Sequence, residues 1–511
     1  MPPDILYTIT SHLPMEGILF ASQVCRHWRS VLTSFPSLWA RISCRGLPQT
    51  IACLQRCKSL PVHLRLDGSF LNAAIAGIIR QGNKIASLTV TYSSDEAPPL
   101  CRLLTFSRPS VERLHISVTR SEVSDWELPE RPMDGVWQDF SSLRELFIFR
   151  YRIPIQELTA PNLTHLALED VFRNREDNAV QSILALLRRC PLLETLLLNH
   201  QGSLLQDASP DYTPVRLPYL HTIEMGRYEV LSGLVTYLDF TQNVAAGLRM
   251  MLQRDVCDDA PPVVVATIQH VLRRVDIRCI TIATSPPFEL DKGFFTRFEG
   301  LQGSLEITLS SQELVSNDTL SGPGGVFFSH GASIEGVREL HIVGFPFDEV
   351  EDLGYICAAM PNVVSISFFN CSEIIPGLLT PNHHGSLPFP HLERVVLFGP
   401  EAELGQVLGR RKELGVPLKT LVIGRGSRDF EYDWGDYTGL DDFVDEMRAE
   451  CPMEILDWGV GNETEYIWST ASDPKCVSQI RCPVMLSSIG FCSAVSMQEA
   501  ESLSFCQYDG E

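Results

Sequence analysis

The sequence predicts an α/β protein in which a small helical head precedes a long array of repeated strand units that share a curved parallel sheet. Apolar residues recur at helical spacing in the first 42 positions, and a short apolar pattern then recurs through most of the chain. The length of 511 residues also exceeds what one ordinary core organises, so several domains or a repeat array are expected.

Composition and charge limit the classes of partner. The chain is 44% hydrophobic and 20% charged, which is typical of a globular protein with a large core. Its 41 basic and 63 acidic side chains give a formal charge of -22. Such a charge repels phosphate backbones and anionic membrane surfaces, so we expect neither nucleic acid nor a membrane as a partner.

The cysteines and the apolar stretches bear on the compartment. Fifteen cysteines are scattered through apolar positions without an evenly spaced framework, which favours reduced thiols in the cytoplasm or the nucleus. No basic segment followed by an apolar one opens the chain. The most apolar stretches, 261–285 and 484–495, are broken by charges or too short to cross a bilayer, so no transmembrane segment is expected.

The first 42 residues predict three short helices. Pro2, Pro3 and Asp4 suit a helix start, and apolar residues recur at helical spacing until Pro14. Residues 16–34 predict a second and a third helix, which Phe35-Pro36 ends before a last turn. A unit this small cannot bury so many apolar side chains by itself, so some of them should face another protein.

This opening segment, MPPDILYTITSHLPMEGILFASQVCRHWRSVLTSFPSLWARI, resembles the F-box, a three-helix module that binds the Skp-type adaptor of cullin-RING ubiquitin ligases. The resemblance rests on Pro3-Asp4-Ile5-Leu6, Leu13-Pro14, Leu19, the run from Val24 to Trp28 and Leu38-Trp39. It implies an adaptor-binding surface made of Pro3, Ile5, Leu6, Leu13, Pro14 and Leu19. It also implies an F-box core or edge made of Val24, Cys25, Trp28 and Trp39.

Two points about this head stay open. Met1 stands where the family usually has its leading Leu, so the sequence leaves the completeness of the N-terminus undecided. A helical cap on a larger domain is the alternative interpretation of the same residues.

The remaining chain repeats the pattern apolar-x-x-apolar-x-apolar. Examples are Leu143/Leu146/Ile148, Leu163/Leu166/Leu168, Leu193/Leu196/Leu198 and Val363/Ile366/Phe368. The last positions of each instance alternate as in a half-buried strand, and helical stretches such as 178–190 and 350–360 lie between instances. Strand, helix and next strand in one direction predict a parallel sheet with right-handed crossovers.

This array resembles the leucine-rich repeat family in the irregular form found behind an F-box, of the fungal type. The resemblance implies an F-box module at 1–45, an irregular solenoid at 46–460 and a cap or loosely ordered tail at 461–511. The family's Asn or Cys after the last Leu stands clearly only at Cys371, so we expect uneven curvature and other contacts for the turn backbone. The pattern is weakest at 226–262 and 316–332.

A candidate substrate face follows from the strand alternation. Side chains between and just after the core positions should point away from the buried interior, and they include Phe147, Phe149, Phe369 and Phe398. Aromatic side chains on a rigid curved sheet are plausible anchors for a protein partner. Alternatively, loops or the tail cover these aromatic side chains.

No catalytic constellation stands out in the sequence. His383-His384 lies in a polar loop pattern, and neither Cys53 with Cys57 nor the cysteines after 475 have convincing zinc spacing. We therefore expect no catalytic residue, no metal site and no cofactor, and hence no enzyme.

Together these patterns predict a substrate receptor of a Skp-cullin-F-box ubiquitin ligase. Its partners would be the Skp-type adaptor, through it a cullin, and a protein substrate bound by the repeat array. The alternative is an F-box interaction scaffold that binds the adaptor without delivering substrates for ubiquitination. An enzyme with a dispersed active site is a third, more distant possibility.

Overall fold

A computed structural model of the chain describes part of its 511 residues. The described residues are 1–44, 47–67, 78, 84–93, 103–107, 110–119, 137–151, 153–169, 171, 179–199, 213–227, 234–240, 245–251, 270, 277–284, 293–300, 304–310, 334–343, 359–369, 387–398, 404–425 and 453–457. They belong to two compact units, one of residues 1–251 with 261–275 and one of 252–260 with 276–511. The predicted cap at 461–511 and the weak stretch at 316–332 lie outside the described residues.

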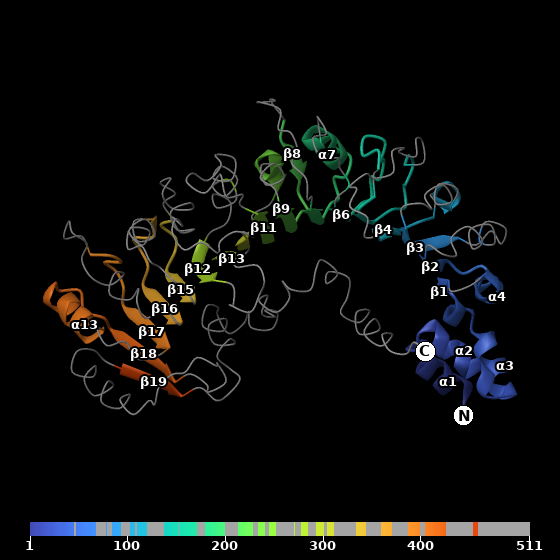
Figure 1. Ribbon diagram of the computed structural model, residues 1–511, viewed down its shortest axis with the longest axis horizontal. Helices are drawn as coiled ribbons and strands as arrows, with labels where there is room; N and C mark the ends of the chain where they lie inside the picture. The colour runs from blue at the N-terminus through green and yellow to red at the C-terminus, as the bar shows by residue number, and fades with distance from the viewer. Residues whose placement is uncertain are drawn as a thin grey trace. The chain divides into compact units, whose positions relative to one another are not determined.

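The head of the first unit contains the three expected helices, α1 (Pro3–Ser11), α2 (Met15–Val24) and α3 (Arg26–Ser34) (Figure 1). Pro3 occupies the start of α1, where its missing N–H leaves no hydrogen bond unmade, and Asp4 lies in the positive first turn. The Cys25 sulfur accepts a hydrogen bond from the Trp28 backbone N–H at 3.4 Å and so caps α3. A 3₁₀ turn, η1 (Pro36–Trp39), follows Phe35.

Trp39 joins this head to the next helix, α4 (Leu47–Cys57). Its side chain is fully buried, its indole N–H donates to the Leu32 carbonyl at 3.0 Å, and the Arg56 guanidinium lies 4.2 Å from its ring centroid. The buried thiol of Cys53 also lies 3.8 Å from the Met15 sulfur. The head is therefore packed onto α4 through η1 and the start of α2.

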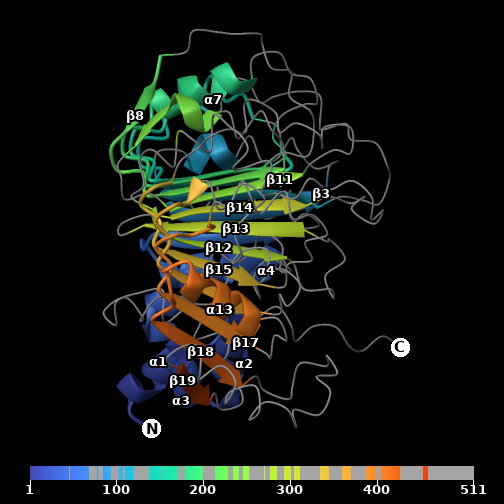
Figure 2. The same cartoon turned by 90° about the vertical axis from the view of Figure 1, so that its left-hand side faces the viewer.

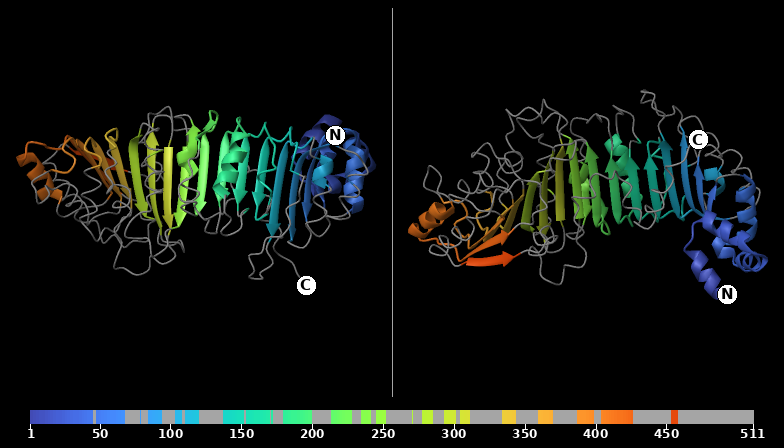
Figure 3. Two further views of the ribbon diagram at one scale, coloured as in Figure 1. Left: turned by 90° about the horizontal axis from the view of Figure 1, so that it is seen from above. Right: turned by 60° about the horizontal axis from the view of Figure 1, so that its bottom comes forward.

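The sheet of the first unit begins directly after the head. Strands β1 (Arg41–Cys44), β2 (Val62–Asp67), β3 (Ile85–Ser93), β4 (Arg113–Thr119), β5 (Glu145–Phe149), β6 (His165–Glu169), β7 (Thr195–Asn199), β9 (Thr222–Arg227) and β11 (Ala245–Met251) pair in this order, each parallel to its neighbour (Figure 3). Strand β11 lies within the stretch where the sequence pattern is weakest, yet it continues the ladder.

Alternating burial places the core on one face of this sheet. The register aligns Leu146 with Leu166 and Leu166 with Leu196, and all three are fully buried. The neighbours of Leu146 in β5, Phe147 and Glu145, are only half-buried. In β5 the period of two thus selects one apolar face, as expected of a strand with one side against a core. In β6 and β7, Ala167 and Leu197 of the opposite face are buried as well.

The same hydrogen-bonded turn precedes several strands of both units. The backbone N–H of Leu163, Leu193 and Val363 each donates to the carbonyl three residues earlier. The two residues at the start of the next strand then donate to the carbonyl just before the neighbouring strand, as Thr164 and His165 N–H do to Arg144 at 2.8 and 2.9 Å. Backbone groups therefore provide much of the pairing that the missing Asn ladder would supply.

Helices and a small sheet accompany the first unit's strands. Helix α7 (Ala179–Arg188) precedes β7, and β8 (Val215–Leu217) pairs in parallel with β10 (Leu238–Phe240) beside it, after the 3₁₀ turn η4 (Val235–Tyr237) (Figure 1). Arg188 of α7 donates to the Thr213 carbonyl at 2.8 Å and so ties the helix to the start of β8. Among the described helices, none is long and apolar enough to cross a membrane.

The second unit contains a mixed sheet. Strands β12 (Ile277–Thr284), β15 (Glu339–Val343), β16 (Ser365–Phe369), β17 (Arg394–Phe398), β18 (Thr420–Arg425) and β19 (Met453–Asp457) pair in parallel in this order. The fully buried side chains of Leu340, Ile366, Val395 and Leu421 are aligned by this register, like the leucine row of the first unit.

Two further strands of the second unit depart from the expected parallel order. β13 (Gly293–Gly300) is antiparallel to β12, and β14 (Ser304–Ser310) is antiparallel to β13 (Figure 2). Residues 301–303 alone join β13 to β14, which is too short for the crossover of a dozen or more residues that a parallel pair needs. The expectation that every strand is parallel to its neighbours is therefore wrong at this hairpin.

Helix α13 (Leu404–Glu413) crosses between β17 and β18 and carries a buried charge. The Arg411 guanidinium donates to the backbone carbonyls of Pro388 and Phe389 at 3.1 and 3.0 Å. Burial lowers the pKa of Arg411 to about 10, so the side chain keeps its charge at pH 7. These bonds hold the helix to the turn before β17.

Candidate protein-binding surfaces

Exposed apolar side chains concentrate on the head. The described residues include ten large apolar side chains that are well exposed, and six of them belong to the first 24 residues: Met1, Ile5, Ile9, Leu13, Phe20 and Val24. We call these six the head surface. Exposed apolar side chains concentrated in one small domain are typical of a protein-binding surface.

Helical periodicity explains how α1 and α2 provide the head surface. Ile5 and Ile9 are four residues apart in α1 and 51% and 48% exposed, whereas Leu6 faces inward and is fully buried. Phe20 and Val24 are four residues apart in α2 and are 70% and 64% exposed. Each helix thus contributes one row of apolar side chains to solvent.

The structure places the residues implied for adaptor binding in two environments. Pro3, Ile5, Leu13 and Pro14 are exposed, and Leu19 is half-buried. Leu6 differs from the expectation, because it lies in the core between the helices and cannot reach an adaptor. Ile9 and Phe20 belong to the apolar positions of the predicted helices, but the resemblance did not implicate them in adaptor binding, although Ile9 follows Ile5 at the spacing of one helical face.

The residues implied for the F-box core also divide. Trp39 is fully buried and Trp28 half-buried. Val24 and Cys25 are exposed, so they are not core residues, because the last turn of α2 directs Val24 to the same side as Phe20. The role of Cys25 is instead to cap α3.

A second candidate surface lies on the face of the first unit's sheet that is opposite to the core. Phe147 and Phe149 are half-buried there, and the His115 ring lies 6.0 and 5.2 Å from their ring centroids. The side chains of Phe369 and Phe398, in the second unit, lie outside the described residues. Only Phe147 and Phe149 of the expected substrate face can therefore be placed.

Arginines from neighbouring strands extend this aromatic group. The register aligns Arg41 with His63, His63 with Ser87 and Ser87 with Arg113, so Arg41 and Arg113 share a row with His63. Arg65 occupies the next row with His115. All three guanidinium groups are exposed, and among the described residues none forms an ion pair with a carboxylate. We call Arg41, Arg65, Arg113, His115, Phe147 and Phe149 the sheet surface.

The two histidines of this region respond to the arginine charges. Burial, followed by the charges of Arg113 and Arg41, lowers the pKa of His63, whose Nδ1 lies 3.3 Å from an Arg113 nitrogen. Burial, followed by the charge of Arg65, lowers the pKa of His115. The lowered pKa values favour the neutral form of both rings, so the positive charge of the sheet surface belongs to the arginines.

The comparison with protein families identifies the head. Residues 1–45 match the family model described as F-box-like. F-box-like domains typically bind Skp-type adaptors, so the match supports an F-box protein with an adaptor-binding role in ubiquitin ligase complexes. No curated protein has significant similarity to the chain.

Proposed function

We propose that the protein is the substrate receptor of a Skp-cullin-F-box ubiquitin ligase. The observation that carries the proposal is the head surface, a group of exposed apolar side chains on a domain that matches the F-box-like family. An adaptor that covered these side chains would remove them from water, which is the main driving force for association.

We further propose that the parallel strands after the head form a leucine-rich-repeat-like solenoid that carries the substrate. Support comes from the aligned rows of buried leucines and from the turn that recurs before several strands. The chain would perform no covalent chemistry in this role, since the ubiquitin-conjugating enzyme recruited through the cullin supplies it.

The sheet surface indicates the chemistry of the substrate. Arg41, Arg65 and Arg113 bring three positive charges to one face of the sheet in a chain whose formal charge is -22, with Glu145 aligned beside Arg113. Among the described residues, none of the three arginines forms an ion pair. Phe147 and Phe149 offer an apolar anchor next to these charges. A substrate segment with several Asp or Glu side chains and one apolar side chain would satisfy both.

A substrate trap in cells tests the receptor role against the scaffold alternative. We expect a full chain with Ile5→Asp and Leu13→Asp, which cannot reach the ligase, to accumulate proteins that the wild-type chain helps to degrade. Proximity labelling followed by mass spectrometry measures this difference. If the variant and the wild-type chain label the same proteins in equal amounts, the result would favour a scaffold that binds the adaptor without delivering substrates.

A change to the sheet surface is expected to weaken substrate binding and to leave adaptor binding unchanged. Arg65→Glu with Phe149→Ala reverses one charge and removes one anchor, so labelling of substrates should fall at least tenfold, about 1.4 kcal/mol or more. Arg216→Glu is the matched control, since Arg216 is an exposed arginine of β8 outside the sheet surface. An equal loss of substrate labelling in both variants, or no loss in the first, would contradict a role of the sheet surface. Adaptor affinity is measured separately and tests only the head.

A further inference from the structure

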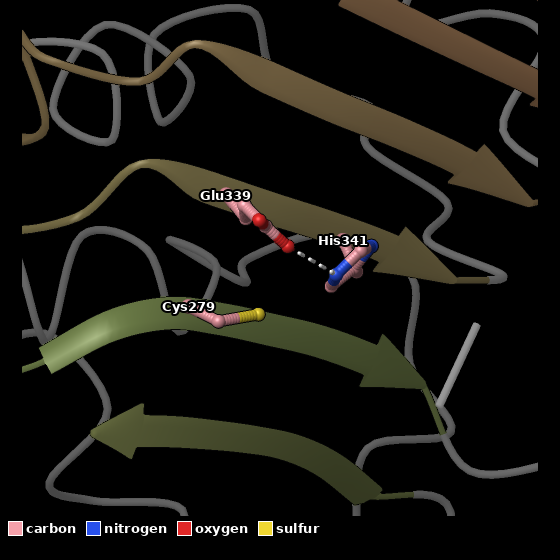
Figure 4. A group of neighbouring side chains, drawn as sticks. All are labelled: Cys279, Glu339 and His341. Atoms are coloured by element: carbon pink, nitrogen blue, oxygen red, sulfur yellow. Dashed lines mark ion pairs between the residues drawn. The ribbon is translucent and has the colours of Figure 1, made fainter. Parts of the chain in front are cut away.

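Two neighbouring strands of the second unit bring three metal-binding side chains together. Cys279 lies on β12, and Glu339 and His341 lie on β15, which pairs in parallel with β12. The register places Cys279 directly opposite Glu339, and His341 follows Glu339 by two residues, so all three share one face of the sheet (Figure 4). Their ligand atoms lie within 4.8 Å of one another.

The central member of this group has no described partner for its ring. His341 is 4% exposed, and among the described residues neither of its nitrogens has a hydrogen-bond partner. Its Nε2 lies 4.0 Å from a Glu339 carboxylate oxygen, which is too long for a hydrogen bond. A buried polar group left without a partner costs about 1–3 kcal/mol, and coordination of an ion would remove this cost.

The sulfur ligand of the group is buried as well. Cys279 is a free thiol and is 3% exposed.

We propose that Cys279, Glu339 and His341 bind a Zn²⁺ ion. Zinc accepts sulfur, nitrogen and oxygen ligands in one tetrahedral site, whereas Ca²⁺ and Mg²⁺ prefer oxygen ligands alone. Bonds of about 2.0–2.3 Å place the ligand atoms of such a site roughly 3.3–3.8 Å apart, so side-chain rotations that shift them by about 1 Å would close the group on the ion. The thiol proton is released on binding, and the fourth position is left for water or a partner's side chain.

Cobalt titration of the full chain tests this site without reference to the ligase role. We expect Co²⁺, added to chain freed of metal with a chelator, to bind once per chain and to produce a thiolate charge-transfer band with tetrahedral visible bands. Zn²⁺ should displace it. Cys279→Ser should abolish the charge-transfer band, and His341→Gln should weaken Zn²⁺ binding at least tenfold.

Two variants keep the test independent of folding defects. Cys190→Ser, a change of a buried cysteine in the first unit, should leave the band and the stoichiometry unchanged. Glu339→Gln alters a side chain that is 39% exposed, so the fold should persist while Zn²⁺ affinity falls and the thiolate band remains. The proposal is overturned if the chain binds no Co²⁺ at micromolar concentration, or if Cys279→Ser retains the band.

Discussion

Replacing Ile5 and Leu13 with aspartate in the full chain is expected to weaken binding to a purified Skp-type adaptor roughly a hundredfold or more. Both side chains are exposed in the head surface, at 51% and 39%, and would become desolvated in a complex. Charges placed in such a contact cost about 3 kcal/mol together, and each 1.4 kcal/mol is about tenfold in affinity. Isothermal titration calorimetry measures the change. The melting temperature should stay close to that of the wild-type chain, because neither side chain supports the core.

Leu192→Asp provides the matched control for this prediction. Leu192 is 40% exposed, as Leu13 is, but it lies in the turn before β7 and outside the head. The control should retain full adaptor affinity. Undiminished binding by the folded Ile5 and Leu13 variant would show that the adaptor does not contact the head surface, and an equal loss in the control would reveal a general effect of added charge.

The sequence predicted the helices of the head more closely than the direction of each side chain. Pro3, Pro14 and Pro36 mark the starts of α1, α2 and η1, because proline limits where a helix can begin. Leu6, implied for the adaptor-binding surface, is buried, and Val24, implied for the F-box core or its edge, is exposed. A short helix that is apolar on more than one face does not specify which face meets the core, since this depends on its contacts with the other helices.

In the array, too, the sequence predicted local strand positions better than the pairing of strands that are distant in the chain. The alternation around Leu166 predicted a strand with one buried face, and the structure buries Leu166 and Leu168 but also Ala167 on the opposite face. The antiparallel pair of β13 and β14 was not predicted, since the apolar pattern is the same for both strand directions and only the short connection decides between them. The start of the sheet at β1 was also missed, because residues 41–44 were assigned to the helical head.

The candidate zinc site could not be found from spacing in the sequence. Cys279 and His341 belong to distant segments, and no short motif joins them. Their proximity depends on the hairpin of β13 and β14, which lies between β12 and β15 in the chain and leaves one edge of β12 available to pair with β15. The charge of the sheet surface likewise depends on strand register, which aligns arginines from separate repeats.

Leu166→Asp is expected to produce the largest loss of stability in the array. Leu166 is fully buried between Leu146 and Leu196, which the register aligns with it on either side. Loss of a buried leucine costs about 2–5 kcal/mol and a buried carboxyl group costs several more, a total comparable to the whole stability of many domains. Because each strand buries its apolar edge against its neighbours, thermal unfolding of the first unit should shift to much lower temperature.

The pH dependence of this loss separates the buried charge from the lost packing. Burial raises the pKa of the introduced carboxyl above its unfolded value of about 3.9, so the folded state favours the protonated form and stability falls further as the pH rises above that value. Leu166→Asn removes the same packing without an ionisable group, so the difference between the two variants should grow from pH 5 to pH 7. His165→Asp places the same charge one residue away, on the half-buried face, and should cost much less. Equal destabilisation by the changes at 165 and 166, measured by circular dichroism, would mean that β6 does not bury one face against the core.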